Sequence, residues 1–558
     1  MYTILIFKHW LLIVIMGLLI TSCTGSTDGL GSEGGFVFTG DSYYISPNGS
    51  DSNDGKSQAS PWKTFKYALD LSTGITQGDE LVLLDGDYTE STTGILREVG
   101  NNGAPLPNDN SSAIPSGLSR LKPTIVRAAS PGKVKIIGPT GIQPLFMGRS
   151  TRKDSFIHVR DITFIGGGML YNTSYVIVKD SGFKGAFSVG TNDHYDGNDF
   201  NLIEDVWIWA ENRRIIAMNY RSHNNVWRRV LVRSEGCDLA GCEGAPKADP
   251  SVGITVYDSQ NISMQNIIVI DRLIRNDSPY ADFATAQHTS ATDADGNGAD
   301  YFLSNNKWLG SMSVNSQDAS LLFEGDYVKA GSDPIWTIDH FISVGSSATG
   351  INIGNTPFNY VAAGSPPSYI KNSTAIIFSN PADVSGIRFN PQHTGGVVSN
   401  TVSVGATRTG FNVLGGTVNS SANYSLSTTD GDFDAGTCTK CISLNADPTT
   451  NGSFRYPVRV ESGSAVATAI SNTDIGANVT NQYGVSGTIF NDPGYDSIST
   501  ASLWPWPNED RIKQEMCIDE GITRGFCSTD FQRNGTSKIT VTSYIWELLG
   551  NAIPSGIY

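Results

Sequence analysis

Charged residues are scarce in this chain of 558 residues, at 16%, and basic residues are the scarcer kind, with 38 Lys and Arg against 54 Asp and Glu. The net charge of −16 disfavours binding to nucleic acid and gives no long-range attraction toward polyanions. An acidic substrate would therefore need a locally basic surface. Apolar residues spaced by three and four over ten or more positions are also missing, which argues against helical repeats.

The main hydrophobic run lies near the N-terminus, between Lys8 and the tetrapeptide Ile20-Thr21-Ser22-Cys23. A short apolar core that ends in small residues is typical of a targeting peptide rather than of a membrane-spanning domain. The tetrapeptide resembles a bacterial lipobox, which implies cleavage before Cys23, lipid on its sulfur, and an outer-membrane or cell-surface location. An ordinary secretory signal is the alternative. We assign residues 1–22 to the signal peptide and residues 23–40 to a flexible tether rich in Gly, Ser and Thr.

Cysteine is rare, and six residues remain of the seven once Cys23 is set aside. They form three local pairs: Cys237 with Cys242, Cys438 with Cys441, and Cys517 with Cys527. An even number in an exported chain predicts disulfides. The second pair has the CxxC spacing of redox and zinc motifs, but neither a βαβ pattern nor a second CxxC accompanies it. A disulfide is therefore favoured there too.

Short strands, in contrast, are abundant. Between residues 200 and 274, apolar pairs spaced by two alternate with other residues, as in a strand with one face turned inward. A second short strand and a third short piece follow each pair, which is the plan of a parallel β-helix. The inward pairs can be extended as Ile162/Phe164, Ser181/Phe183, Val206/Ile208, Val230/Val232, Ile267/Val269, Met312/Val314, Ile342/Val344, Ala375/Ile377 and Val402/Val404. Steps of 19 to 45 residues indicate a solenoid. A β-sandwich is the alternative.

A further pattern runs from Tyr43 to Tyr88 and includes Tyr44-Ile45-Ser46-Pro47, Asp54-Gly55, Pro61-Trp62-Lys63-Thr64-Phe65 and Gly78-Asp79. It resembles the first segment of right-handed parallel β-helix proteins of the pectate-lyase-like superfamily, which is rich in extracellular polysaccharide lyases and glycoside hydrolases. The resemblance implies an all-β, right-handed, single-stranded parallel β-helix. We expect an N-terminal cap and first coil over 41–95, with a helix near Trp62 to Leu71, coils with inserted loops over 96–494, and a small C-terminal cap containing helix over 495–558.

A candidate site follows from the repeat, because outward residues at one register position of successive coils stack about 4.8 Å apart. Aligning the first strands places Trp209, Arg233, Ile270 and Asn315 in one column, and Glu211, Glu235 and Arg272 in another. Two carboxylates beside an arginine suit a calcium-assisted polysaccharide lyase, which neutralises the uronate and removes the adjacent proton.

Lyases of the superfamily often use Lys or Arg as the base, so the resemblance favours Lys247 and Arg272 as catalytic residues. Glu211 and Glu235 would then hold calcium. A second possible calcium loop contains Asp293, Asp295 and Asn297, although Ser304 stands where an EF-hand has Glu. A solvated turn is the alternative for that loop.

Six arginines and no carboxylate lie between Arg213 and Arg233. We predict that Arg213, Arg214, Arg221 and Arg233 bind the substrate. Ion pairs on the surface of the solenoid, worth less than about 1 kcal/mol each, are the alternative.

Together these features predict a monomeric surface lipoprotein that binds an extracellular, acidic polysaccharide and cleaves it by β-elimination. A glycoside hydrolase would need two carboxylates about 5–10 Å apart, for which Glu211 and Glu235 are candidates. A non-catalytic adhesin, in which the arginines only hold a polyanion, is the alternative of another class.

Overall fold

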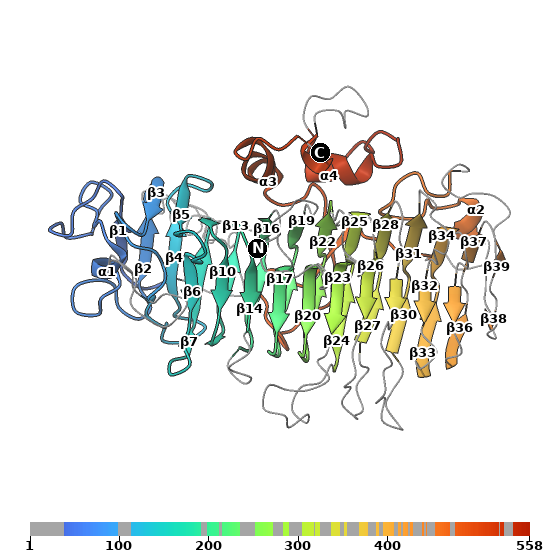
Figure 1. Cartoon of the computed structure of the whole chain (residues 1–558), viewed down its shortest axis with the longest axis horizontal. Helices are drawn as coiled ribbons and strands as arrows, with labels where there is room; N and C mark the ends of the chain where they lie inside the picture. Colours follow the sequence, from blue (N-terminus) through green and yellow to red (C-terminus); the bar gives the residue numbers. More distant parts are fainter. Residues whose placement is uncertain are drawn as a thin grey trace, which may run out of the picture.

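The computed structural model (Figure 1) describes residues 38–98, 113–190, 198–210, 215–234, 252–271, 283–288, 304–316, 319–323, 336–345, 351–353, 368–377, 387–389, 394–406, 411–413, 417–421, 424–427, 438–439, 442–443, 452–468, 475–523, 525–528 and 539–558. The chain winds into a parallel β-helix built from three long sheets of 14, 13 and 10 strands, which we call sheets A, B and C. From β8 onward, successive strands belong to sheets A, B and C in turn until β35, apart from the two-residue strand β11. The predicted all-β parallel β-helix is confirmed.

Sheet A contains β1 (Ser42–Ile45), β2 (Glu80–Leu83), β4 (Thr124–Ala128), β8 (Ile157–Arg160), β12 (Ile177–Lys179), β15 (Leu202–Glu204), β18 (Val226–Arg228), β21 (Ser263–Gln265), β24 (Asn306–Leu309), β27 (Trp336–Asp339), β30 (Ser368–Lys371), β33 (Thr394–Ser399), β36 (Thr417–Ser421) and β38 (Cys438–Thr439). Sheet B contains β3 (Gly86–Thr89), β5 (Val134–Ile137), β9 (Thr163–Ile165), β13 (Gly182–Lys184), β16 (Trp207–Ala210), β19 (Leu231–Ser234), β22 (Ile268–Ile270), β25 (Met312–Ser316), β28 (Ile342–Gly345), β31 (Thr374–Ile377), β34 (Val402–Ala406), β37 (Tyr424–Ser427) and β39 (Ile442–Ser443). Sheet C contains β6 (Leu145–Met147), β10 (Gly168–Leu170), β14 (Phe187–Val189), β17 (Ile215–Tyr220), β20 (Val252–Tyr257), β23 (Phe283–His288), β26 (Ala319–Phe323), β29 (Ile351–Ile353), β32 (Ile387–Phe389) and β35 (Phe411–Val413). β7 (Asp154–Ser155) and β11 (Thr173–Ser174) form a separate parallel pair.

One residue with a left-handed backbone makes the turn from sheet A to sheet B in successive coils. Examples are Asp180 (φ 49°), Asp205 (φ 54°), Asn266 (φ 49°) and Asn372 (φ 47°). Asn and Asp tolerate this conformation better than most residues because their short side chains can hydrogen-bond locally. Arg229 (φ 51°) and His340 (φ 55°) are larger residues at this position, and the side chain of Arg229 is held by an ion pair to Asp205.

Inward residues of the three sheets form one apolar core along the solenoid. The predicted inward pairs at Val206, Val230 and Ile267, with their partners two residues on, belong to this core and are confirmed. Their outward neighbours, including Trp207 and Leu231, are buried in a second apolar cluster outside sheet B.

The predicted register is wrong by one residue in three later coils. Met312 and Val314 pair with Ile268 and Ile270 on the outward side, and the inward partner of Val269 is Ser313. The pairs at Ile342 and Val402 are shifted in the same way. A one-residue shift exchanges the two faces of a strand. Both faces of sheet B are buried here, so apolar alternation alone does not distinguish inside from outside.

The N-terminal cap packs on the first coil. The helix expected between Trp62 and Leu71 is a single turn, α1 (Phe65–Ala68), and the side chain of Thr64 accepts a hydrogen bond from the Tyr67 amide at its start. Phe65 and Ala68 are buried in the main core. This turn therefore adds apolar residues to the core beside β1 and β2.

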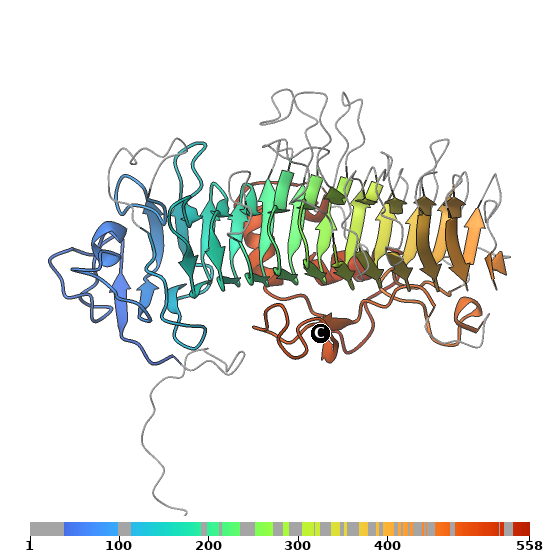
Figure 2. The ribbon, with the colours of Figure 1, turned by 90° about the horizontal axis from the view of Figure 1, so that it is seen from below.

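The described residues between 475 and 558, which we call the C-terminal segment, fold back along the side of the solenoid (Figures 1 and 2). They contain β40 (Asn481–Tyr483), antiparallel to β41 (Ile498–Ser502), α3 (Glu509–Lys513), a π-helical turn (Gln514–Ile518), a 3-10 turn (Gly525–Cys527) and α4 (Val541–Trp546). α2 (Ala465–Thr468) precedes them and lies near the last coils. We expected residues 495–558 to cover the last coil, and this expectation is corrected, because α3 and α4 lie beside the middle coils.

Apolar packing holds the C-terminal segment against sheet B. Trp504, Trp506 and Trp546 are buried and share a cluster with the outward residues Trp207 and Trp209. Trp504 and Trp506 are therefore core residues rather than a platform for sugars. Burial of large aromatic side chains is a major contribution to packing energy, so the segment is an integral part of the fold.

Candidate functional site

The candidate site predicted from the sequence lies on the outward face of sheet B. Three of the four residues in its first predicted column pair in register. Trp209, Arg233 and Ile270 pair in register across β16, β19 and β22. Asn315 does not belong to this column, because Val314 is the partner of Ile270. The C-terminal segment covers this part of the wall, so its side chains face protein rather than solvent.

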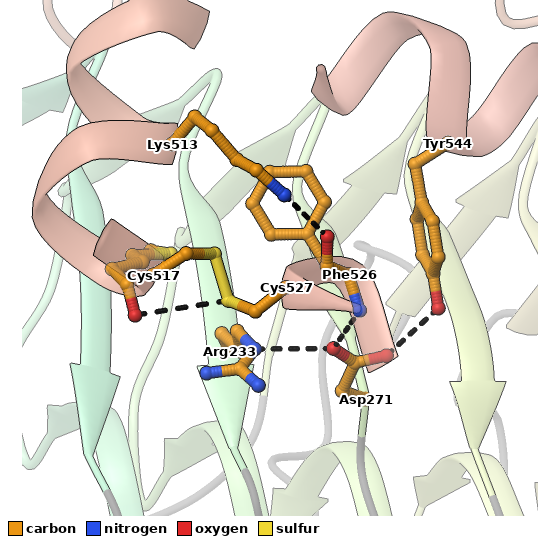
Figure 3. Close-up of a disulfide and its surroundings, with 8 residues drawn as sticks. Arg233, Asp271, Lys513, Cys517, Phe526, Cys527 and Tyr544 are labelled. Carbon is orange, nitrogen blue, oxygen red and sulfur yellow. Dashed lines mark hydrogen bonds and ion pairs between the residues drawn. A yellow bond between two sulfur atoms is a disulfide. The ribbon is translucent and has the colours of Figure 1, made fainter. Parts of the chain in front are cut away.

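Arg233 lies at the centre of this covered region (Figure 3). It is 1% exposed, and its Nε donates to Asp271 Oδ2 over 3.1 Å. The same carboxylate accepts from the Phe526 amide (2.7 Å) and from the Tyr544 hydroxyl (2.8 Å), both in the C-terminal segment. Asn315 Nδ2 donates to its other oxygen. Asp271 therefore fixes the C-terminal segment to two coils of the solenoid.

The C-terminal segment also contains a disulfide at this contact. Cys517 is bonded to Cys527, so the predicted pairing is confirmed for these two residues. Nearby, Lys513 Nζ donates to the Phe526 carbonyl over 2.8 Å. Burial, and then repulsion from Arg233, lower the pKa of Lys513 to about 8. The disulfide and the lysine thus hold the turn that presents the Phe526 amide to Asp271.

Arg221 is the second described arginine of the predicted substrate-binding set. It is 5% exposed and pairs with Asp258 in the next coil, with 3.2 Å between Arg221 Nε and Asp258 Oδ2. Burial and pairing of Arg221 and Arg233 correct the expectation that these two guanidinium groups contact a polysaccharide. Of the two readings of the arginine run, ion pairing describes both residues, although the pairs are buried rather than exposed.

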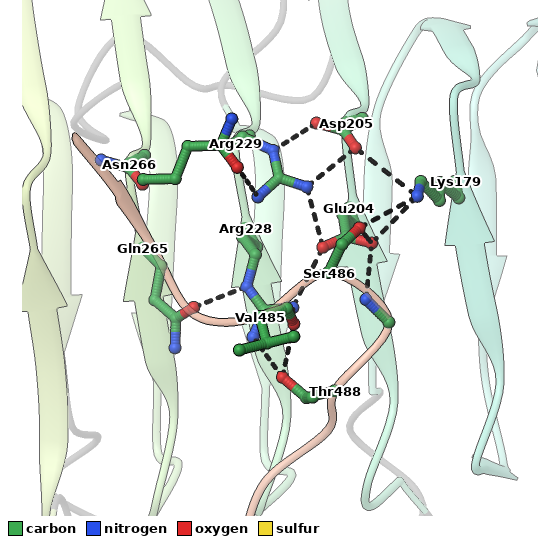
Figure 4. Close-up of polar contacts among 12 residues, drawn as sticks. Lys179, Glu204, Asp205, Arg228, Arg229, Gln265, Asn266, Val485, Ser486 and Thr488 are labelled. Atoms are coloured by element: carbon green, nitrogen blue, oxygen red, sulfur yellow. Dashed lines mark hydrogen bonds and ion pairs between the residues drawn. The ribbon is translucent and has the colours of Figure 1, made fainter. Parts of the chain in front are cut away.

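The neighbouring arginines of the same run form a buried charge cluster (Figure 4). Arg229 donates to both oxygens of Asp205, at 2.5 and 2.9 Å. Arg228 donates to Glu204, Gln265, Thr488 and the carbonyls of Val485 and Tyr495, and it is 0% exposed. The cluster therefore joins sheet A to the C-terminal segment, and it leaves no open basic groove at these positions.

Glu204 is the shared acceptor of this cluster. It pairs with Arg228, Arg229 and Lys179, and it accepts from Ser486 Oγ and the Gly487 amide. Burial alone would raise the pKa of Glu204, but the three cations lower it to about 2. The carboxylate is therefore ionised at neutral pH and stabilises the docked C-terminal segment.

Most predicted site residues lie outside the described residues. These are the catalytic candidates Lys247 and Arg272, the substrate-binding candidates Arg213 and Arg214, the metal candidates Glu211, Glu235, Asp293, Asp295 and Asn297, the lipidation site Cys23, and Cys237, Cys242 and Cys441. Cys438 belongs to β38, and its side chain is also outside the description.

Strand order nevertheless groups these residues along the chain. Residues 211–214, 235–251 and 272–282 connect a strand of sheet B to the next strand of sheet C in three consecutive coils, ending at β17, β20 and β23. All catalytic and substrate-binding candidates except Arg221 and Arg233 belong to these connections. The possible calcium loop at 293–297 belongs instead to the connection from β23 to sheet A, which follows the other end of the sheet C strand. The two sets of proposed calcium ligands therefore belong to connections at opposite ends of the sheet C strands.

Sheet C faces the viewer in Figure 1, away from the C-terminal segment. At the end of its strands, Tyr220 and Tyr257 occupy paired positions, and their half-buried rings stack with their centroids 4.9 Å apart. His288 follows at the same register position in the next coil. The guanidinium carbon of Arg221 lies 5.3 Å from the centre of the Tyr220 ring. No pattern in the sequence selected these tyrosines.

Within the part of the chain that the structure describes, no group of three or more His, Cys, Asp or Glu residues is arranged to hold a metal ion. The same residues include no helix of the length and apolarity needed to cross a bilayer. Phe146, Met169 and Met218 are half-buried residues in one outward column of sheet C, which also contains Ser188 and Thr255.

Comparisons with known proteins find structural likeness at low identity. No protein-family model and no curated protein matches this chain. A complex of XylC with xylose is 10% identical, with a TM-score of 0.37, and the match covers 67% of this chain and 69% of the other. A rhamnogalacturonan lyase is 13% identical (TM-score 0.36; 73% and 87% covered). PfbA, a surface adhesin of Streptococcus pneumoniae, is 10% identical (TM-score 0.35; 63% and 85% covered). At these scores the fold assignment rests on the parallel sheets, and no activity is transferred.

Proposed function

We propose that this chain is an exported lipoprotein that binds an extracellular acidic polysaccharide on the outward face of sheet C and cleaves it by β-elimination. One observation carries the proposal. The connections that hold Glu211, Arg213, Arg214, Glu235, Lys247 and Arg272 all lead into three consecutive strands of sheet C. Those strands end at Tyr220, Tyr257 and His288, so charged and aromatic residues flank one stretch of the sheet.

The reaction needs a cation at the uronate carboxylate and a base at the adjacent carbon. A base takes the proton next to the carboxylate, the electron pair forms a carbon–carbon double bond, and the glycosidic oxygen leaves with a proton. We assign the proton transfer to Lys247 and the neutralisation of the carboxylate to Arg272, with Arg213 and Arg214 binding neighbouring uronates. If calcium is bound, Glu211 and Glu235 would hold it, and the ion would add to the neutralisation.

The reaction class is tested by incubating the purified protein with a panel of uronate polymers, with and without EDTA. A new ultraviolet absorbance from the double bond supports elimination. New reducing ends without that absorbance would contradict it in favour of a hydrolase. Binding without either product would contradict catalysis in favour of an adhesin.

Tyr220→Ala and Tyr257→Ala should each raise the apparent Kd for the polysaccharide by roughly fivefold, because an aromatic contact is worth about 1 kcal/mol. The measurement is a binding titration on a fixed polymer length. Tyr369→Ala is the matched control, since Tyr369 is a half-buried tyrosine on sheet A. Equal effects of all three substitutions would place the binding face elsewhere.

Under the same proposal, Lys247→Ala and Arg272→Ala should lower turnover by orders of magnitude while the fold survives.

Cys23→Ser should release the protein from membranes, because the lipid would have no sulfur to attach to. Several acyl chains give firm anchoring, whereas one alone is marginal. The measurement is the distribution between the membrane pellet and the supernatant after cell lysis. Unchanged membrane association of the variant would contradict the lipoprotein proposal without bearing on the polysaccharide face.

A further inference from the structure

Two large apolar side chains are exposed at one tight turn of the solenoid wall. Leu118 is 58% exposed and Leu121 is 65% exposed. The Leu118 amide donates to the Lys122 carbonyl over 2.9 Å, and the Lys122 amide donates to the Ser119 carbonyl over 3.0 Å. These bonds hold the backbone of the turn that carries the two exposed leucines.

The turn lies beside the beginning of the described chain. A Cβ added to Gly78 would be 3.6 Å from Leu118 Cδ1, and a Cβ added to Gly40 would overlap the Gly78 carbonyl. The Asp41 amide donates to Asp79 Oδ1 over 3.1 Å. Residues 40–41 and Leu118 therefore pack on the same short stretch of chain.

This position limits the distance between the turn and a membrane anchor. Residues 24–39 separate Cys23 from Gly40 and are rich in Gly, Ser and Thr. A flexible chain of that length has a root-mean-square span of about 20 Å. Lipid on Cys23 would thus keep the two leucines close to the bilayer surface.

Two contacts join the turn to other parts of the molecule. Arg120 Nη1 and Nη2 donate to the two carboxylate oxygens of Asp492, at 3.0 and 2.5 Å. The Arg120 guanidinium also lies 5.8 Å from the centre of the Tyr175 ring. The turn is therefore joined to the C-terminal segment and to Tyr175, which lies just before β12 of sheet A. Lys122 is exposed and suits lipid phosphates.

We propose that Leu118 and Leu121 insert into the lipid interface beside the anchor, and that this second attachment sets the orientation of the solenoid on the membrane. A single flexible anchor leaves the body free to rotate, whereas a nearby second contact benefits from the high effective concentration that the tether provides. The inference rests on the lipoprotein part of the proposed function. The partner is a lipid surface, because lipid at Cys23 would be held within reach of both leucines.

The test measures the depth of a nitroxide label attached through Leu121→Cys in the full-length lipidated protein. The protein is reconstituted in vesicles of phosphatidylethanolamine and phosphatidylglycerol, and collisions of the label with oxygen and with a water-soluble nickel complex are compared. Ser555→Cys is the control, since Ser555 is exposed near the C-terminus, which lies over sheet B. The parent protein, without an introduced cysteine, measures background labelling.

We expect the label at position 121 to shift toward oxygen accessibility in vesicles, and the label at position 555 to stay accessible to nickel. An aqueous label at position 121 on protein that floats with the vesicles would overturn the inference and leave the lipoprotein proposal standing. Failure to float would instead contradict the lipoprotein proposal. Spin–spin broadening between labels at position 121 in Cys23→Ser protein without vesicles would overturn the inference in favour of a contact between two copies.

Discussion

Asp271→Asn should lower the free energy of unfolding by about 3–5 kcal/mol, the range for removing one partner of a buried ion pair. The substitution leaves the buried Arg233 without its carboxylate. It also turns an amide NH₂ toward groups that donate to Asp271, among them the Phe526 amide and the Tyr544 hydroxyl. Chemical denaturation measures the loss, and limited proteolysis should show earlier cleavage of the C-terminal segment.

Asp492→Asn is the matched control for this prediction. It makes the same chemical change in an ion pair whose side chains are 45% and 22% exposed. Such a pair contributes at most about 1 kcal/mol, because water screens it. Similar losses in the two variants would mean that Asp271 does not hold the C-terminal segment in solution.

The main core was predictable because its residues obey the two-residue period of a strand. Val206, Val230 and Ile267 each lead an inward pair, and stacking across parallel strands preserves that period from coil to coil. The prediction failed at Met312 and Ile342, where serines occupy inward positions and the larger residues contact the C-terminal segment. Sequence periodicity cannot reveal which face a distant segment covers.

The arginine run shows why part of the candidate site could not be predicted. It contains no carboxylate over its own length, yet Arg229 meets Asp205 from 24 residues earlier, and Arg221 meets Asp258 from 37 residues later. A solenoid brings residues one coil apart into contact, so the local sequence does not give the local charge. The stacked pair of Tyr220 and Tyr257, 37 residues apart, was missed for the same reason.

The ion pairs of Arg221 and Arg233 also leave fewer of the predicted arginines to bind the substrate. Two of the four predicted substrate-binding arginines pair with Asp258 and Asp271, so binding of a polyanion would depend on Arg213, Arg214 and the catalytic candidates. All of these residues belong to connections that lead into sheet C, so we expect the substrate to bind on sheet C rather than on sheet B. In our proposal, the covered outward face of sheet B has a structural role, and the outward face of sheet C binds the substrate.

Glu204→Gln should lower the free energy of unfolding at neutral pH by about 3–5 kcal/mol, since it removes the common acceptor of three buried or nearly buried cations. Glu98→Gln is the matched control, because Glu98 is 35% exposed in its pairs with Arg149 and Arg152 and should contribute at most about 1 kcal/mol.

The pH dependence of the free energy of unfolding distinguishes loss of the carboxylate charge from loss of its hydrogen bonds in the Glu204→Gln protein. The pKa of Glu204 falls from an ordinary value of 4.5 to about 2 in the fold. A depressed pKa adds stability that is complete above the unfolded value and disappears as the pH falls toward the folded value. The parent should therefore lose stability more steeply than Glu204→Gln between about pH 4.5 and 2, measured by denaturant unfolding at each pH. Parallel curves for the two proteins would show that Glu204 holds the C-terminal segment through hydrogen bonding alone, and not through its charge.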